Sequence, residues 1–224
     1  MDSLEETKEK TRRLIEDIKN QLPTQFEIHG LSKIHFKIVV LRECFLFRMY
    51  DLGRSSVILL DQDCRIPAYV LVRSILETMA YFYMYYEKVE EVYKNRSTGA
   101  INDFLEKMLV SFSGTENKNY RPKEAMDHIT KIIPTFYGHY QHFCDFAHPN
   151  TAGLMDAYSS IDRSTMTVSF SLDVFRESIL QTSWGMIHTT LHQFLIYFNK
   201  ISSFFQTIYD VCEEESKDVP PSSE

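Results

Sequence analysis

Two opposite charges lie inside the most apolar stretch of the chain. The segment YVLVRSILETMAYFYMYY, residues 69–86, contains Arg73 and Glu77 and no other charged residue. In a helix these two residues are one turn apart on one face, and the other faces are apolar, so the pair should be at least partly buried. Desolvation makes a buried ion pair costly unless further polar groups satisfy it. The pattern therefore predicts either a polar site completed by other helices or a structural clamp between helices.

A second group of candidate residues lies around His148. The segment YGHYQHFCDFAHPN, residues 137–150, ends a predicted helix at His148, directly before a proline. A histidine at a helix end can be oriented and partly exposed, as acid–base catalysis or a phosphate contact requires. Its alternative role is that of a helix C-cap. We take Arg73, Glu77, His148 and Asn150 together as the candidate catalytic group.

Four further histidines have spacings that could hold a metal ion. His139 and His142 are three residues apart in one predicted helix, and His188 and His192 are four apart in the last helix. Two helices of a bundle can direct imidazoles at a common metal in this way. The Glu-x-x-His pairs of di-iron bundles are missing, and packed or surface histidines are the alternative. We therefore predict no metal and no cofactor, with these four residues as the weak metal candidates.

Long helices are needed to position all these residues. The chain has only seven glycines and seven prolines against 16 Phe and 13 Tyr, which favours long elements with few connections. Asp61 and Asp63, in the break DQDCRIP, are the candidate N-caps of the third helix. Apolar periodicity predicts helices over residues 3–22, 34–60, 100–112, 122–133 and 135–147, a third helix from this break to about 93, and a last helix from Asp173 to about 212.

One region departs from helical periodicity. Residues 148–172 have no helical pattern, and the run TMTVSFSL within them alternates as a short strand does, which predicts a small hairpin or an extended flap. The fold class is therefore all-α, a helical bundle with long antiparallel helices and a short hairpin or flap before the last helix. We assign residues 1–23 to an exposed N-terminal amphipathic helix, 34–212 to a single bundle domain and 213–224 to a disordered tail.

Composition limits the partners and the compartment. A net charge of -7 argues against a general polyanion binder, although it leaves room for a local basic patch. The four cysteines are far apart in the sequence, and we interpret them as reduced, mostly buried thiols of a cytoplasmic protein. Arg73 and Glu77 would each cost roughly 2.5–3.5 kcal/mol near the centre of a membrane span, so we expect 69–86 to be a core helix.

The apolar helix containing LVRSILE, followed by a later helix that ends in HPN and by a flap, resembles HEPN-type helical domains over roughly residues 35–205. It is similar in particular to uncharacterised bacterial relatives with an Arg-x-x-x-Glu helix and a later His-Pro segment. The resemblance implies a bundle that often dimerises, with a metal-independent RNA-cleaving site in active members that serve as toxins or antiviral-defence effectors. Their signature, Arg and then His after four to six residues, does not precede His148. It occurs at Arg121 and His128, which form the alternative catalytic pair.

Three functions remain open at this point. In the first, the chain is an RNA-directed effector, in which His148 acts as acid–base group or phosphate contact and Arg73 stabilises phosphate charge. In the second, it is a non-catalytic interaction or sensor subunit of a defence or regulatory complex, the Arg73–Glu77 pair is structural, and the aromatic helices form the interface. A metal-binding bundle is the third reading. We expect a cytoplasmic homodimer that binds RNA or a protein partner and no membrane.

A cleft that joins Arg73 to His148 would favour the RNA-directed effector. A sealed Arg73–Glu77 pair would favour the non-catalytic subunit.

Overall fold

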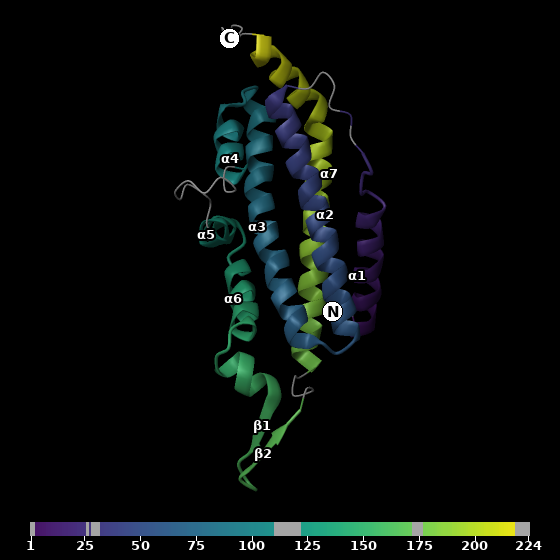
Figure 1. Cartoon of the computed structure of the whole chain (residues 1–224), viewed down its shortest axis with the longest axis vertical. Helices are drawn as coiled ribbons and strands as arrows, with labels where there is room; N and C mark the ends of the chain where they lie inside the picture. Colours follow the sequence, from purple (N-terminus) through teal and green to yellow (C-terminus); the bar gives the residue numbers. More distant parts are fainter. Residues whose placement is uncertain (1–2, 26, 28–31, 110–121, 172–176, 218–224) are drawn as a thin grey trace.

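The computed structural model describes residues 3–25, 27, 32–109, 122–171 and 177–217. It confirms an all-α fold with long packed helices and a two-stranded hairpin before the last helix (Figure 1). The elements are α1 (Leu4–Lys19), α2 (Lys33–Asp61), α3 (Arg65–Asn95), α4 (Gly99–Leu109), α5 (Pro122–Ile132), α6 (Phe136–Ala147), the π-helical turn η2 (Thr151–Asp156), β1 (Ser159–Asp162), β2 (Thr167–Phe170) and α7 (Glu177–Lys217).

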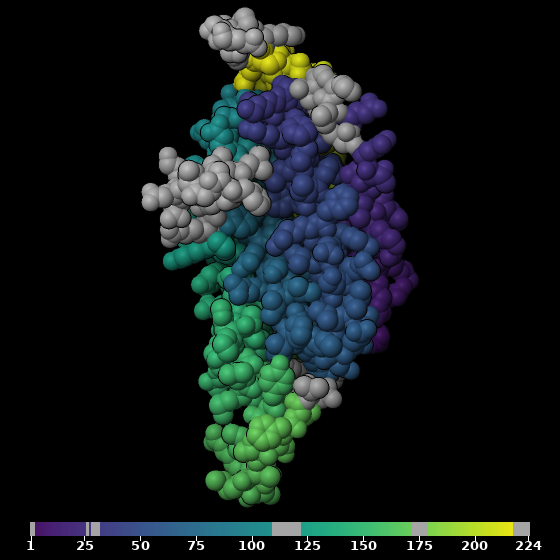
Figure 2. Space-filling view, in the orientation of Figure 1, coloured from purple at the N-terminus to yellow at the C-terminus, as the bar shows by residue number. Residues whose placement is uncertain are grey.

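Helix α3 is the centre of the arrangement. It packs against α2 and α7 on one side and against α4, α5 and α6 on the other. Figure 1 shows α1, α2, α3 and α7 running side by side along the long axis, while the β1–β2 hairpin projects beyond one end of the bundle. In the space-filling view this hairpin forms the narrow end of the molecule (Figure 2).

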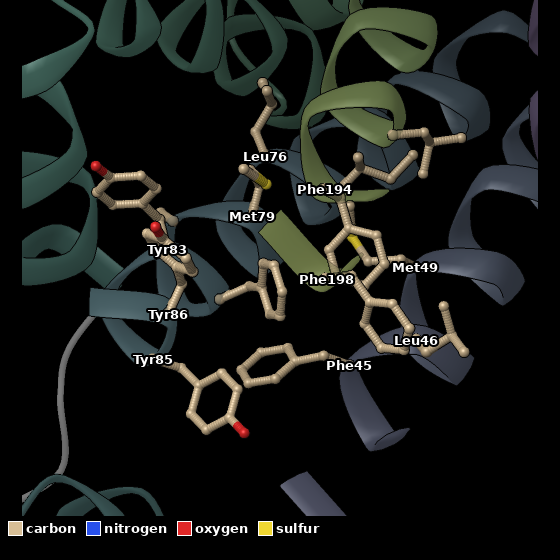
Figure 3. Packing of buried hydrophobic residues seen from close by; sticks show 14 of the residues in the cluster. Phe45, Leu46, Met49, Leu76, Met79, Tyr83, Tyr85, Tyr86, Phe194 and Phe198 are labelled. Atoms are coloured by element: carbon tan, nitrogen blue, oxygen red, sulfur yellow. The ribbon is translucent and has the colours of Figure 1, made fainter. Parts of the chain in front are cut away.

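The aromatic runs of the sequence fill the core between these helices (Figure 3). The ring of Phe82 lies 4.4 Å from that of Phe194 and 5.3 Å from that of Phe45, measured between centroids. The hydroxyl of Tyr85 is fully buried and donates to the backbone oxygen of Ile38 over 2.7 Å. The expectation that the aromatic helices form an intermolecular interface is therefore wrong for these side chains, because they are already packed inside one chain.

Short polar motifs set the helix starts, and they do not all lie where we expected. Helix α1 begins with a capping box, in which Ser3 and Glu6 satisfy each other's backbone N–H groups. The prediction that Asp61 or Asp63 caps α3 is wrong. Asp61 is the last residue of α2, Asp63 lies in the connecting turn with a φ of 56°, and Cys64 is the N-cap without a side-chain hydrogen bond.

The first and last helices belong to the same bundle as the rest. Helix α1 packs against α7 and α2 and buries its apolar stripe, so it is not an exposed separate element. Helix α7 continues past the predicted end at 212 to Lys217, and the Glu215 carboxylate accepts a hydrogen bond from the backbone N–H of Thr98 over 3.0 Å. Residues 213–217, which we predicted to begin the tail, are therefore the last part of α7. The expected cap Asp173 lies outside the described residues.

The cysteines are free, but they are not mostly buried. Cys44 and Cys64 are exposed, Cys144 is half-buried, and only Cys212 is buried. The prediction of buried thiols is wrong because Cys64 lies at the short turn between two helices and Cys44 lies at the edge of an open pocket of α2. Among the described helices, none has an apolar stretch long enough to cross a membrane.

Candidate functional site

The Arg73–Glu77 pair lies where α6 packs on α3. The rings of Phe143 and Phe146 on α6 both contact the ring of Tyr69 on α3, with centroids 5.7 Å away. Tyr140, earlier on α6, reaches Glu77, later on α3. The two helices are therefore antiparallel, and their contact, which we call the α3–α6 seam, carries both apolar and polar residues.

Three side chains form the polar part of the seam. Arg73 Nε donates to Glu77 Oε1 over 3.2 Å, and the hydroxyl of Tyr140 donates to the same oxygen over 2.8 Å. The Arg73 guanidinium also lies 5.6 Å from the centre of the Tyr140 ring. The side chains of Arg73 and Glu77 remain 28% and 22% exposed, so the pair is partly buried, as its sequence context predicted. It is neither sealed from solvent nor freely solvated.

The surroundings of the seam keep Tyr140 and Cys144 protonated and Arg73 charged. Burial, followed by the hydrogen bond to Glu77, raises the pKa of Tyr140, and burial also raises the pKa of the Cys144 thiol beside it. Partial burial alone would lower the pKa of Arg73, but nearby Cys144, Tyr140 and Glu77 outweigh it, and the net pKa is raised. Tyr140 is consequently a hydrogen-bond donor rather than a base, and Cys144 is a thiol rather than a nucleophilic thiolate.

The other two members of the candidate catalytic group lie at the end of α6. His148 is the C-cap, its backbone N–H donates to the oxygen of Cys144 over 3.1 Å, and its side chain is exposed. The Asn150 side chain accepts a hydrogen bond from the N–H of Gly153 over 2.9 Å and thereby caps η2. Within the described residues, no hydrogen bond or ion pair joins either of them to Arg73 or Glu77. The structure thus assembles two of the four predicted residues, with Tyr140 and Cys144 as the neighbours.

Tyr140 and Cys144 are residues that the sequence analysis missed. They lie four residues apart, on one face of α6. That periodicity was a usable signal, because a helix carrying the Arg73–Glu77 pair needs a partner helix with polar groups on one face.

The alternative catalytic pair is only half described. His128 on α5 forms a hydrogen bond between its Nε2 atom and the Glu87 carboxylate of α3, and its ring lies 6.5 Å from that of Tyr83. Arg121 lies outside the described residues. The described half of the pair therefore acts as a contact between α5 and α3.

The histidines considered for a metal lie in two separate places. His142 packs edge-on against Phe143 and Phe146, and burial lowers its pKa. His188 and His192 stack with their rings 6.0 Å from one another and inclined by 4°. Helix α6, which carries His139 and His142, packs on α3 and α5, whereas α7 packs on α1, α2 and α3. In the part of the chain that is described, no three His, Cys, Asp or Glu side chains are grouped to hold a metal ion.

A pocket lies on the other side of Glu77, between α2, α3 and α4. Its cavity volume is about 320 Å³. Arg48 stands at this pocket, and its Nε donates to the hydroxyl of Thr78 over 3.0 Å. Neither Arg73 nor His148 lines it, so it is not the cleft that would have joined those two residues. The lining residues are Leu41, Cys44, Phe45, Arg48, Glu77, Thr78, Tyr81 and Met108.

Comparison with known proteins adds no assignment. No protein-family model matches the sequence, and neither a curated protein nor a solved structure is significantly similar to it. The likeness to HEPN domains therefore stays a prediction from the motifs of this chain.

Proposed function

We propose that this protein is a HEPN-like, non-catalytic interaction subunit that works as a homodimer, with two copies meeting through the β1–β2 hairpin. The observation that carries the proposal is an apolar hairpin face that is open to solvent. The resemblance to HEPN domains suggests a cytoplasmic defence or regulatory complex, with RNA or another protein as the further partner.

The hairpin is amphipathic. Its strands are antiparallel, with Ile161 opposite Val168 and Ser159 opposite Phe170. Because side chains alternate along a strand, Ile161, Val168 and Phe170 share one face, and their exposed fractions are 57%, 49% and 79%. The opposite face consists only of polar residues, Ser160, Asp162, Thr167 and Ser169.

An exposed apolar face of this kind is unfavourable in a lone chain. A two-stranded hairpin is marginally stable in water, and its outer edges offer unpaired backbone groups to another chain. Covering a large aliphatic or aromatic side chain contributes about 1.5–3 kcal/mol. Covering three such side chains on each of two copies therefore favours association and offsets part of the entropic cost of joining two chains.

Charge favours this face, rather than the bundle surface, as the place where two copies meet. The chain carries a net charge of -7, so two copies repel each other over most of their surfaces. Within the hairpin, residues 159–170, the charged side chains are Asp162 and Arg163, whose charges cancel. The hairpin also projects from the bundle, so a contact there keeps the two negative bundles apart (Figure 1). A symmetric dimer needs one self-complementary patch, and this face is one.

In this proposal the Arg73–Glu77–Tyr140 group is structural. It fastens α6 to α3, and α6 leads directly into η2 and β1. The polar seam thereby holds the stem from which the hairpin projects.

The test is the oligomeric state of a matched pair of variants. Ile161→Thr with Val168→Thr removes apolar contact but keeps β-branched residues that suit strands. Ser160→Thr with Ser169→Thr places the same residue type on the polar face. By sedimentation velocity, we expect wild type and the second variant to be dimers and the first variant to be a monomer with an unchanged circular dichroism spectrum. A monomeric wild type, or a dimer in both variants, contradicts the proposal.

An RNA-directed effector is the second candidate function. It is favoured by the partial exposure of Arg73 and by the exposed His148 at the end of the helix that carries Tyr140. Purified wild type should leave total RNA intact if the interaction subunit is the right assignment. Cleavage that disappears in His148→Ala would favour the nuclease instead, and cleavage that disappears only in Arg121→Ala and His128→Ala would assign it to the alternative pair.

A further inference from the structure

The pocket between α2, α3 and α4 contains a positioned cation that the hairpin contact does not use. The Arg48 side chain is held by its Nε–H, which donates to Thr78 Oγ1, and Thr78 is itself fixed by donating to the backbone oxygen of Ser74 over 2.7 Å. The two Nη groups of Arg48 donate to no carboxylate within the described part of the chain. They form a planar fork suited to a carboxylate or a phosphate.

Glu77 supplies an acceptor at the same pocket. Its Oε1 atom takes the hydrogen bonds from Arg73 and Tyr140, while its Oε2 atom accepts none from any described residue. The negative charge of Glu77 is already balanced by Arg73. Of the charged side chains that line the pocket, Arg48 is thus the one that no described carboxylate pairs with, and an anionic ligand is favoured.

The remaining walls suit a compact apolar body. Leu41, Phe45 and Met108 line the pocket from three different turns of α2 and α4, and the exposed Cys44 lies at its edge. Burial, together with the charges of Glu77 and Glu124, raises the pKa of Tyr81 to about 12, so its phenol stays neutral. A volume of about 320 Å³ is at the lower end of the range for small-molecule pockets, roughly 300–1,000 Å³.

We propose that this pocket binds a small anionic molecule with an apolar or aromatic body. Its carboxylate or phosphate pairs with the Nη groups of Arg48, and an N–H or O–H group of the ligand donates to Glu77 Oε2. The hairpin dimer and this site lie on different elements, so the test of one proposal does not depend on the result for the other.

Four probes test the charge and the kind of acid group. Indole-3-acetate is compared with indole, and adenosine monophosphate with adenosine, by calorimetric titration into the full chain. We expect at least one anion to bind. Its neutral counterpart should have an affinity at least about tenfold lower, because a charge-assisted hydrogen bond is lost. Binding of indole-3-acetate identifies the acid group as a carboxylate, and binding of adenosine monophosphate identifies it as a phosphate.

Three variants locate the binding. Arg48→Gln should lower the affinity for the anion about tenfold or more. Cys44→Trp, which fills the pocket without changing its charge, should also lower this affinity. Arg13→Gln, an exposed position on α1 paired with Glu9, makes the same charge change elsewhere and should leave the affinity unchanged. Failure of both anions to bind the wild type overturns the proposal. So does an affinity that Arg48→Gln and Cys44→Trp leave unchanged, or one that Arg13→Gln lowers as much as Arg48→Gln.

Discussion

At the scale of single residues, Glu77 connects the two sides of α3. One carboxylate oxygen is held by Arg73 and by Tyr140 from α6, and the side chain also borders the pocket formed with α2 and α4. The strength of the seam therefore depends on a hydrogen bond between two different helices rather than on the local ion pair alone. Partly exposed ion pairs contribute little by themselves, usually below about 1 kcal/mol.

Replacing Tyr140 by Phe tests this dependence. The substitution removes the hydroxyl that donates to Glu77 but keeps the ring beside Arg73, so we expect the free energy of unfolding to fall by about 1 kcal/mol. Urea titration followed by circular dichroism measures it. Tyr137→Phe is the matched control on the same helix, because Tyr137 is exposed and its hydroxyl makes no hydrogen bond to a described residue. Equal losses in the two variants would show that the Tyr140 hydroxyl does not fasten the seam.

The Arg73–Glu77 contact was predictable because it is local. Four residues of helix place the two side chains on one face whatever the rest of the fold does. Tyr140 and Arg48 were not assigned, because each joins a pair of helices whose relative position no spacing along the chain determines. The capping role of Asn150 was not predicted for a related reason. Its amide competes for a nearby backbone N–H, and only the turn geometry shows that Gly153 takes it.

At the scale of elements, the junction between α6 and η2 depends on one glycine. A Cβ atom at position 153 would lie 2.0 Å from the backbone oxygen of His148 and 3.0 Å from that of Phe146. Both neighbours are backbone atoms and cannot rotate away. The chain can turn back on α6 and start the hairpin because residue 153 has no side chain.

Two alanine substitutions within this region should have opposite effects. Gly153→Ala should destabilise the protein by about 1–3 kcal/mol, since the backbone of the junction must shift. Gly138→Ala, at a helical position with open space around it, should stabilise by about 0.5–1 kcal/mol. Thermal unfolding of both variants measures this. Destabilisation by Gly138→Ala, or none by Gly153→Ala, would contradict the described junction.

The helices themselves were predictable to within a few residues, and the hairpin from its alternating pattern, because both signals repeat along the chain. The start of α3 was not. Two acidic residues before a proline look like helix caps, yet α2 continues through Asp61, and its side chain pairs with Arg12 of α1 over 2.7 Å. The spacing of the acidic residues along the chain does not show this contact to a distant helix.

At the scale of the whole molecule, α1 closes the bundle by packing on α7. Ile18 is completely buried at this contact, and Thr11, Leu14 and Ile15 accompany it. The sequence pattern predicts α1 as an exposed amphipathic helix outside the bundle domain. Its narrow apolar stripe is nevertheless covered along its length.

Truncating that stripe should therefore affect the entire fold. Ile18→Ala should lower the free energy of unfolding by about 2–5 kcal/mol, because it leaves a cavity in the core. Its neighbour Asp17 is exposed, and Asp17→Ala should change stability by less than about 0.5 kcal/mol. Denaturant unfolding should stay a single transition that shifts as one. An unshifted midpoint in Ile18→Ala would mean that α1 unfolds independently of the bundle.

The pairing of the first helix with the last also sets the order of events on the ribosome. Helix α1 emerges early, while its partner α7 starts only at Glu177. At translation rates of about 5–20 residues per second, the apolar stripe of α1 waits roughly 8–30 s before its covering helix is made. During that interval α2, which is made earlier, can cover α1 only in part, because the larger share of the α1 packing is with α7.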